Sequence, residues 1–263
     1  MQLKKKSIKG MTLALLMLMA AMAGCIGTED ETTDEDEEAK PAFLDASDAG
    51  YTYASDVDNH RSLMQDLCDI KSAASDSNWD EAKNIYTNGK NAEKSDGSFR
   101  TLAGFAAASG KNHNYDTFYG QDGAIGAHIM AAMDGTGDFA GASDTVRYQG
   151  IAKLTANMGM VGYTIHELNA AVAKADAGNT DNDSGAPHNW DEGWAFFHGP
   201  DEHWSCSPAY TMKKRAADYG TETNGVSNAL AASEQAMVDG LAALQTGDKA
   251  GYDTATETVI KNI

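Results

Sequence analysis

The side chains best suited to chemistry gather in the segment 189–203, where carboxylates and imidazoles stand close to large aromatic rings. Pro187 and Asn189 predict that a helix begins here, because proline is favoured in the first turn of a helix and asparagine at the N-cap. The candidate metal ligands on this helix are Asp191, Glu192 and His198. Glu192 has an alternative role, since a glutamate three residues after an asparagine N-cap can close a capping box.

A second group of polar side chains lies on a long helix predicted over residues 143–175. Tyr163, His166 and Glu167 follow one another at spacings of three and one residues, so phenol, imidazole and carboxylate share one helix face. A short loop connects this helix to the one that begins near Asn189, which predicts that the two are antiparallel neighbours. Oxygen-rich ligand sets of this kind favour hard cations such as ferric iron.

Several catalytic and binding motifs are absent from the sequence. Residues 166–170 read His-Glu-Leu-Asn-Ala, which begins like a zinc protease motif but lacks the second histidine. The chain contains no phosphate-binding glycine loop and no nucleophile elbow. We therefore expect a binding protein and not an enzyme.

The first 24 residues predict a lipoprotein signal peptide, because a basic stretch and a short apolar run lead to Met22-Ala23-Gly24-Cys25. We expect a lipid on Cys25 to anchor the protein at the outer face of the cell membrane, in the periplasm or at the cell surface. Residues 25–47 are acidic and predict a disordered tether. The formal net charge of −19 makes nucleic acid an unlikely partner.

Cysteine usage leaves two alternatives open. Cys68 and Cys206 could form a disulfide in an oxidising compartment, or they could remain separate thiols. A disulfide would bring the first long helix close to the segment that follows Asn189.

The remaining chain, residues 48–263, has the composition of an all-α protein. It is rich in alanine, contains few prolines and shows little of the alternation that strands require. We expect a bundle of roughly eight or nine helices, with residues 113–120 as an aromatic loop. Its core should include one apolar stripe formed by Trp190, Trp194 and Phe197.

Pieces of this sequence, in this order, resemble the algal low-iron-inducible periplasmic protein family, which includes iron-assimilating proteins of green algae and is related to the phytotransferrins. The resemblance covers roughly residues 49–262. The pieces are Asp66-Leu67-Cys68-Asp69-Ile70, Ala82-Lys83-Asn84-Ile85-Tyr86, Gly89-Lys90-Asn91, Phe118-Tyr119-Gly120, His166-Glu167-Leu168, Trp190-Asp191-Glu192-Gly193-Trp194-Ala195-Phe196-Phe197, Tyr210, Lys214-Arg215 and Tyr219-Gly220. The chain departs from the family in having fewer cysteines and a prokaryotic type of lipid-attachment sequence.

The resemblance implies extracytoplasmic capture of Fe(III) in support of iron uptake, with carbonate as a candidate synergistic anion and an iron permease or receptor as a candidate partner. The matching ligand positions would be the pairs 166–167 and 191–192, with Tyr163 and His198 as further candidates. Lys214 and Arg215 could hold the anion. The alternative function is a surface interaction or structural lipoprotein without a metal site.

Overall fold

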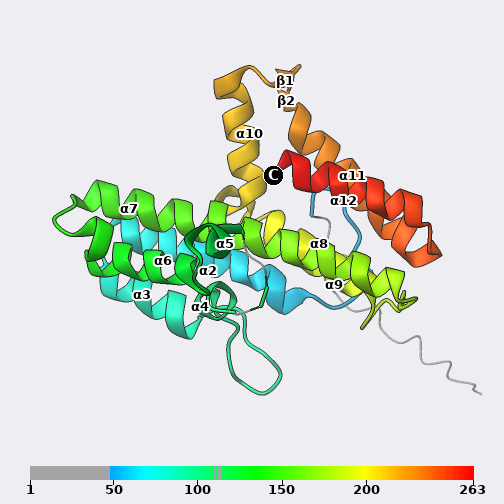
Figure 1. Ribbon diagram of the computed structural model, residues 1–263. Helices are drawn as coiled ribbons and strands as arrows, with labels where there is room; N and C mark the ends of the chain where they lie inside the picture. Colours follow the sequence, from blue (N-terminus) through cyan, green and yellow to red (C-terminus); the bar gives the residue numbers. More distant parts are fainter. Residues whose placement is uncertain (1–47, 109, 112–113) are drawn as a thin grey trace, which may run out of the picture. The chain divides into compact units, whose positions relative to one another are not determined.

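The computed structural model describes residues 48–263, except for residues 109 and 112–113 (Figure 1). The predicted signal peptide, the acidic tether and Cys25 lie outside the described residues. The elements, in chain order, are α2 (Asp58–Ser75), α3 (Trp79–Asn88), α4 (Leu102–Ala106), α5 (Asn114–Tyr119), α6 (Ala124–Asp134), η2 (Gly137–Phe139), α7 (Asp144–Lys153), η3 (Leu154–Met160), α8 (Val161–Asp176), α9 (Ala186–Phe197), η4 (Trp204–Cys206), α10 (Pro208–Tyr219), β1 (Glu222–Thr223), β2 (Val226–Ser227), α11 (Asn228–Thr246) and α12 (Lys249–Asn262). In this part of the chain β1 and β2 form a small antiparallel hairpin and helices make up the rest of the regular structure, so the predicted all-α class is confirmed.

Polar residues begin many of these helices. The side chains of Ser143, Ser207 and Ser227 accept a hydrogen bond from a backbone N–H in the first turn of α7, α10 and α11. Asn78 does the same for α3, so the Asn-Trp-Asp-Glu sequence at that position is a helix start.

Two predicted boundaries differ in the structure. Helix α9 begins at Ala186 and not at Asn189, which therefore lies inside the helix and caps nothing. The helix predicted over residues 143–175 is divided into α7, the π-helical segment η3 and α8. In addition, residues 114–119 form helix α5, where a loop was expected.

Helix α9 lies between two hydrophobic clusters. Trp190 and Trp194 belong to one cluster, which also contains side chains of α11 and α12. Phe196 belongs to the other cluster, which is built on Leu63 and Leu67 of α2. Helix α9 also packs along α8, and α11 packs along α12 (Figure 1). Because both sides of α9 are buried, the polar groups on this helix need partners inside the protein.

Cys68 of α2 and Cys206 of η4 are joined by a disulfide bond. The bond connects positions 138 residues apart in the chain. A cross-link over so long a loop restricts the unfolded chain, and in the chain-entropy account it stabilises the folded state by about 5 kcal/mol.

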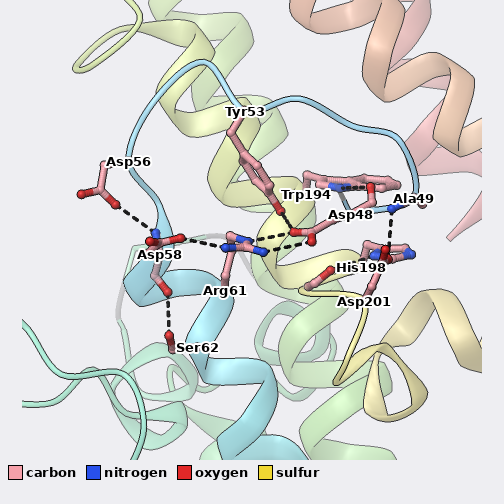
Figure 2. Close-up of polar contacts among 11 residues, drawn as sticks. Asp48, Ala49, Tyr53, Asp56, Asp58, Arg61, Ser62, Trp194, His198 and Asp201 are labelled. Atoms are coloured by element: carbon pink, nitrogen blue, oxygen red, sulfur yellow. Dashed lines mark hydrogen bonds and ion pairs between the residues drawn. The ribbon is translucent and has the colours of Figure 1, made fainter. Parts of the chain in front are cut away.

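The segment before α2 is held by a polar network around Asp48 (Figure 2). Arg61 of α2 donates two hydrogen bonds to the Asp48 carboxylate, at 2.8 and 3.0 Å, and the Tyr53 hydroxyl donates a third at 2.5 Å. Trp194 donates its indole N–H to the Asp48 carbonyl oxygen at 3.3 Å. These contacts attach residues 48–57 to α2 and α9.

None of the helices in the described ranges combines the length and apolar character that a membrane span requires.

Replacing Gly240 of α11 by alanine is expected to lower the free energy of unfolding by about 1–3 kcal/mol, because a Cβ there would lie 2.2 Å from Cζ2 of Trp190. Gly126 of α6 is the control, since a Cβ at that position meets its nearest atom at 3.5 Å. Gly126→Ala should be neutral or stabilising through helix propensity. Chemical denaturation measures both variants, and equal effects would contradict the close packing of α11 on Trp190.

Candidate metal centre

Helices α2 and α9 bring two histidines to one carboxylate oxygen. His188 and Glu192 lie one turn apart on α9, and Nε2 of His188 is 3.2 Å from Oε1 of Glu192. Nε2 of His60, from α2, lies 3.2 Å from the same oxygen. The side chain of Glu192 is only 13% exposed, so this contact takes place largely out of solvent.

Helix α8 adds a second carboxyl group. Glu167 and Glu192 are hydrogen-bonded to each other through their side chains. The Asn189 amide donates a further hydrogen bond to Oε2 of Glu167. We refer to His60, Glu167, His188 and Glu192 as the His–Glu cluster. It gathers two imidazoles and two carboxyl groups from α2, α8 and α9, of which α2 is far from the other two in sequence.

The pKa values of the two carboxyl groups, Glu167 and Glu192, shift in opposite directions. Burial and the neighbouring charge of Glu192 raise the pKa of Glu167 well above its usual range. Burial acts in the same direction on Glu192, but the hydrogen bond from His188 and the proximity of His60 outweigh it and lower the pKa of Glu192. Glu167 therefore carries a proton near neutral pH, while Glu192 is ionised.

The pKa values of the two histidines shift in opposite directions. Burial lowers the pKa of His60 to about 4, so this ring is neutral. The hydrogen bond to Glu192 raises the pKa of His188. The Nδ1 atom of His60 and the Oδ1 atom of Asn189 are buried and have no hydrogen-bond partner among the described residues. Buried polar atoms without a hydrogen-bond partner are uncommon in folded proteins, and these two lie in the cluster and directly beside it.

A hydrogen-bonded chain behind His188 sets the orientation of its ring. The Ser55 hydroxyl lies 2.9 Å from Nδ1 of His188 and 2.9 Å from Oδ2 of Asp191. Since the carboxylate only accepts, the hydroxyl proton points to Asp191 and the hydroxyl oxygen accepts from Nδ1–H. With Nδ1–H held by Ser55, the hydrogen bond from Nε2 to Glu192 requires a doubly protonated ring. Loss of the Nε2 proton would free that nitrogen's lone pair for a metal ion, as in metal-binding histidines whose second nitrogen is held by an outer partner.

Asp191 lies outside the His–Glu cluster. Its carboxylate accepts hydrogen bonds from the Tyr51 hydroxyl at 2.7 Å, the Ala54 and Ser55 backbone N–H groups at 2.8 Å and the Ser55 hydroxyl. Burial raises its pKa to about 6, and the four donors oppose that rise. Asp191 therefore anchors the segment before α2 and positions His188 through Ser55.

Tyr163 and His166 border the cluster. The Tyr163 ring packs against Phe105 and Phe196, and burial followed by the charges of Glu167 and Glu192 raises the pKa of its phenol to about 12. Nε2 of His166 lies 3.9 Å from Oε1 of Glu167, and the ring lines a cavity of about 90 Å³. Nζ of Lys111, which lines the same cavity, lies 3.1 Å from Nε2 of His166.

The other predicted site residues lie elsewhere. The His198 ring is stacked between Trp194 and Trp204, with centroid distances of 5.0 and 5.5 Å, and its Nδ1 contacts the Gly199 carbonyl oxygen. Lys214 and Arg215 lie on α10 and line a different cavity. None of these three residues, His198, Lys214 and Arg215, belongs to the His–Glu cluster.

Sequence reasoning missed His60 as a member of this cluster. Its available signal was a histidine one turn before Leu63, on the face that α2 buries. The helix was expected to begin near Asn189, so the spacing of four residues between His188 and Glu192 was not recognised as a helical pair.

Among the residues that the structure describes, no three His, Cys, Asp or Glu side chains already form a group that could hold a metal ion. In the His–Glu cluster the imidazoles and carboxyl groups face one another through hydrogen bonds and a close polar contact from His60. A metal ion bound there would take the place of the protons that these groups share, and the side chains would open slightly around it. Two imidazoles and two carboxylates are a donor set that suits iron.

A family model described as low iron-inducible periplasmic protein matches residues 42–261 of this chain. Comparisons with curated proteins and with solved structures gave no match. The matched range includes the whole His–Glu cluster, the Ser55–Asp191 pair and the disulfide. The chain therefore belongs to the low iron-inducible periplasmic protein family.

Proposed function

We propose that this protein binds Fe(III) outside the cytoplasm, in the His–Glu cluster, and supports iron uptake without catalysing a reaction. The observation that carries the proposal is the contact of two imidazole Nε2 atoms with one carboxylate oxygen of Glu192. Membership in a family named for low-iron induction supports iron as the metal. A lipid on Cys25 would hold the protein near the membrane, where a permease or receptor could accept the iron.

The test is a titration of the whole chain with Fe(III), supplied as a weak chelate, followed by desalting and metal analysis. We expect one ion retained per chain. We also expect no strong tyrosinate band, because the raised pKa of Tyr163 opposes the phenolate form. A visible charge-transfer band would add Tyr163 to the ligands, and failure to retain iron would favour an interaction protein.

The titration is run with and without bicarbonate, since the family resemblance implies carbonate as a synergistic anion. Lys111, beside His166, is a cation at the edge of the cluster that could neutralise such an anion. Tighter iron retention with bicarbonate would support carbonate assistance. Equal iron retention with and without bicarbonate would mean that the side chains of the cluster bind iron without carbonate.

Iron affinity is expected to rise with pH between about pH 5 and pH 8, because Glu167 and His188 must lose protons to bind the ion. Titrations in buffers of different ionisation enthalpy should show at least about one proton released per ion near pH 7. An affinity that does not change with pH, after correction for the chelator, would contradict binding at Glu167.

The same raised pKa has the opposite effect on the metal-free protein. A carboxyl group whose folded pKa is raised contributes stability that is present below its unfolded pKa, near 4.5, and lost as the pH rises through the folded value. Glu167 should therefore lower the free energy of unfolding as the pH increases above 4.5.

Replacing Ser55 by alanine is expected to weaken Fe(III) binding about 10- to 100-fold, because His188 loses the partner that orients its ring. The control is Ser62→Ala on α2, where the hydroxyl donates to the Asp58 carbonyl oxygen and does not touch the cluster. Competition against a chelator measures both affinities. Equal iron affinity in wild-type protein and Ser55→Ala would show that the ring needs no such support.

A further inference from the structure

A second site of unusual charge lies away from the His–Glu cluster. A cavity of about 210 Å³ is lined by residues of α2, α7, η3, η4 and α10. Its lining includes four cations and, among the described residues, no carboxylate; the cations are Lys71, Lys153, Lys214 and Arg215. Such a group is unexpected in a chain with a net charge of −19, where acidic side chains outnumber basic ones by 39 to 20.

Most of these cations have no ion-pair partner in the part of the chain that the structure describes. Arg215 forms an ion pair with Asp218 at 2.6 Å. The three lysines have no ion pair among the described residues. Burial and the like charges of Lys153 and Lys214 lower the pKa of Lys71, so the ammonium groups are close enough to repel one another. An anion between them would offset that repulsion.

The cavity also offers neutral hydrogen-bonding groups and enough space for an anion. Its lining includes the side chains of Tyr148, Gln149, Asn157, Tyr210 and Thr211. A water molecule takes about 30 Å³ in the liquid, so the cavity has room for a small oxyanion with several oxygen atoms. Lysine and arginine with hydroxyl and amide donors are the groups that proteins use for phosphate and carboxylate.

We propose that this cavity binds a small multivalent oxyanion, which is inorganic phosphate or a polycarboxylate such as citrate. The site is separate from the His–Glu cluster: Lys71 follows His60 by eleven residues on α2, about 16 Å along the helix axis. No residue of the cavity lining belongs to the cluster. The inference goes beyond the proposed iron binding and does not depend on it.

Isothermal titration of the whole chain with phosphate, citrate and acetate at low ionic strength tests this site. We expect phosphate or citrate to bind at least about tenfold more tightly than acetate, because one carboxylate cannot engage several cations at once. The anion that binds more tightly, phosphate or citrate, shows which of these two classes of oxyanion the cavity prefers. Equal and weak binding of all three anions would overturn the proposal.

Two variants assign any binding to the cavity. The double variant Lys71→Gln and Lys214→Gln should weaken binding of the preferred anion at least about tenfold. Lys213→Gln is the matched control, because Lys213 neighbours Lys214 on α10 but lies outside the cavity lining and over the Trp204 ring. If Lys213→Gln weakened anion binding equally, the loss would come from the change in net charge, and anion binding could not be assigned to the cavity. Lys153→Gln, at an exposed position, provides the same test if the double variant does not fold.

Discussion

Replacing Glu192 by glutamine is expected to weaken Fe(III) binding at least about a hundredfold, since even outer partners of metal ligands are worth 10- to 100-fold. Glutamine keeps the shape of the side chain but removes the negative charge that faces both His60 and His188. The variant should still fold, because the amide can accept a hydrogen bond from either ring. Metal retention after desalting and competition with a chelator measure the loss.

The control for this variant is Glu257→Gln on α12. Glu257 is also paired with a cation one turn away, Lys261, but both side chains are well exposed. The substitution therefore removes the same charge without touching the cluster, and the iron affinity should stay unchanged. If Glu192→Gln kept the wild-type affinity, the His–Glu cluster would not be the iron site.

Truncating Trp190 to alanine is expected to lower the free energy of unfolding by about 3–5 kcal/mol. The indole is fully buried in the cluster that joins α9 to α11 and α12. Its Nε1–H also donates a hydrogen bond to the Met237 carbonyl oxygen at 2.8 Å, and the truncation would remove this bond. Denaturant unfolding monitored by circular dichroism measures the change.

Trp79→Ala is the matched control for this truncation. The Trp79 ring is only partly buried and packs beneath the Arg147 guanidinium, 4.0 Å from the ring centroid. Removing it should cost clearly less than removing Trp190. Equal losses in the two variants would contradict the assignment of Trp190 to the centre of the core.

The sequence predicted much of the fold and part of the site. Helical composition and the polar residues at helix starts were enough for the all-α class. The antiparallel pairing of the two helices that carry Glu167 and Glu192 follows from the short loop between them, and the structure places these two carboxyl groups in contact.

The other features of the site could not be predicted, because they depend on contacts between distant parts of the chain. His60 precedes Glu192 by 132 residues, and no periodicity within α2 shows which helix will cover it. Asp191 and Glu192 are adjacent acids of similar type. Only the docking of the irregular segment before α2, through Tyr51 and Ser55, decides that one carboxylate is an anchor and the other faces the histidines.

The π-helical segment η3 gives this chain a place where its length can change. Seven residues, Leu154–Met160, connect α7 to α8 without a break, and each residue of a π-helix turns the chain less than a residue of an α-helix. Deleting one of them would let six α-helical residues cover nearly the same rotation, so Glu167 would still face α9. A deletion in the α-helical part between η3 and Glu167 would instead rotate Glu167 by about 100° about the helix axis and away from α9. We therefore expect natural relatives and engineered variants to tolerate the loss of one residue within η3 and not in the turns of α8 that follow it.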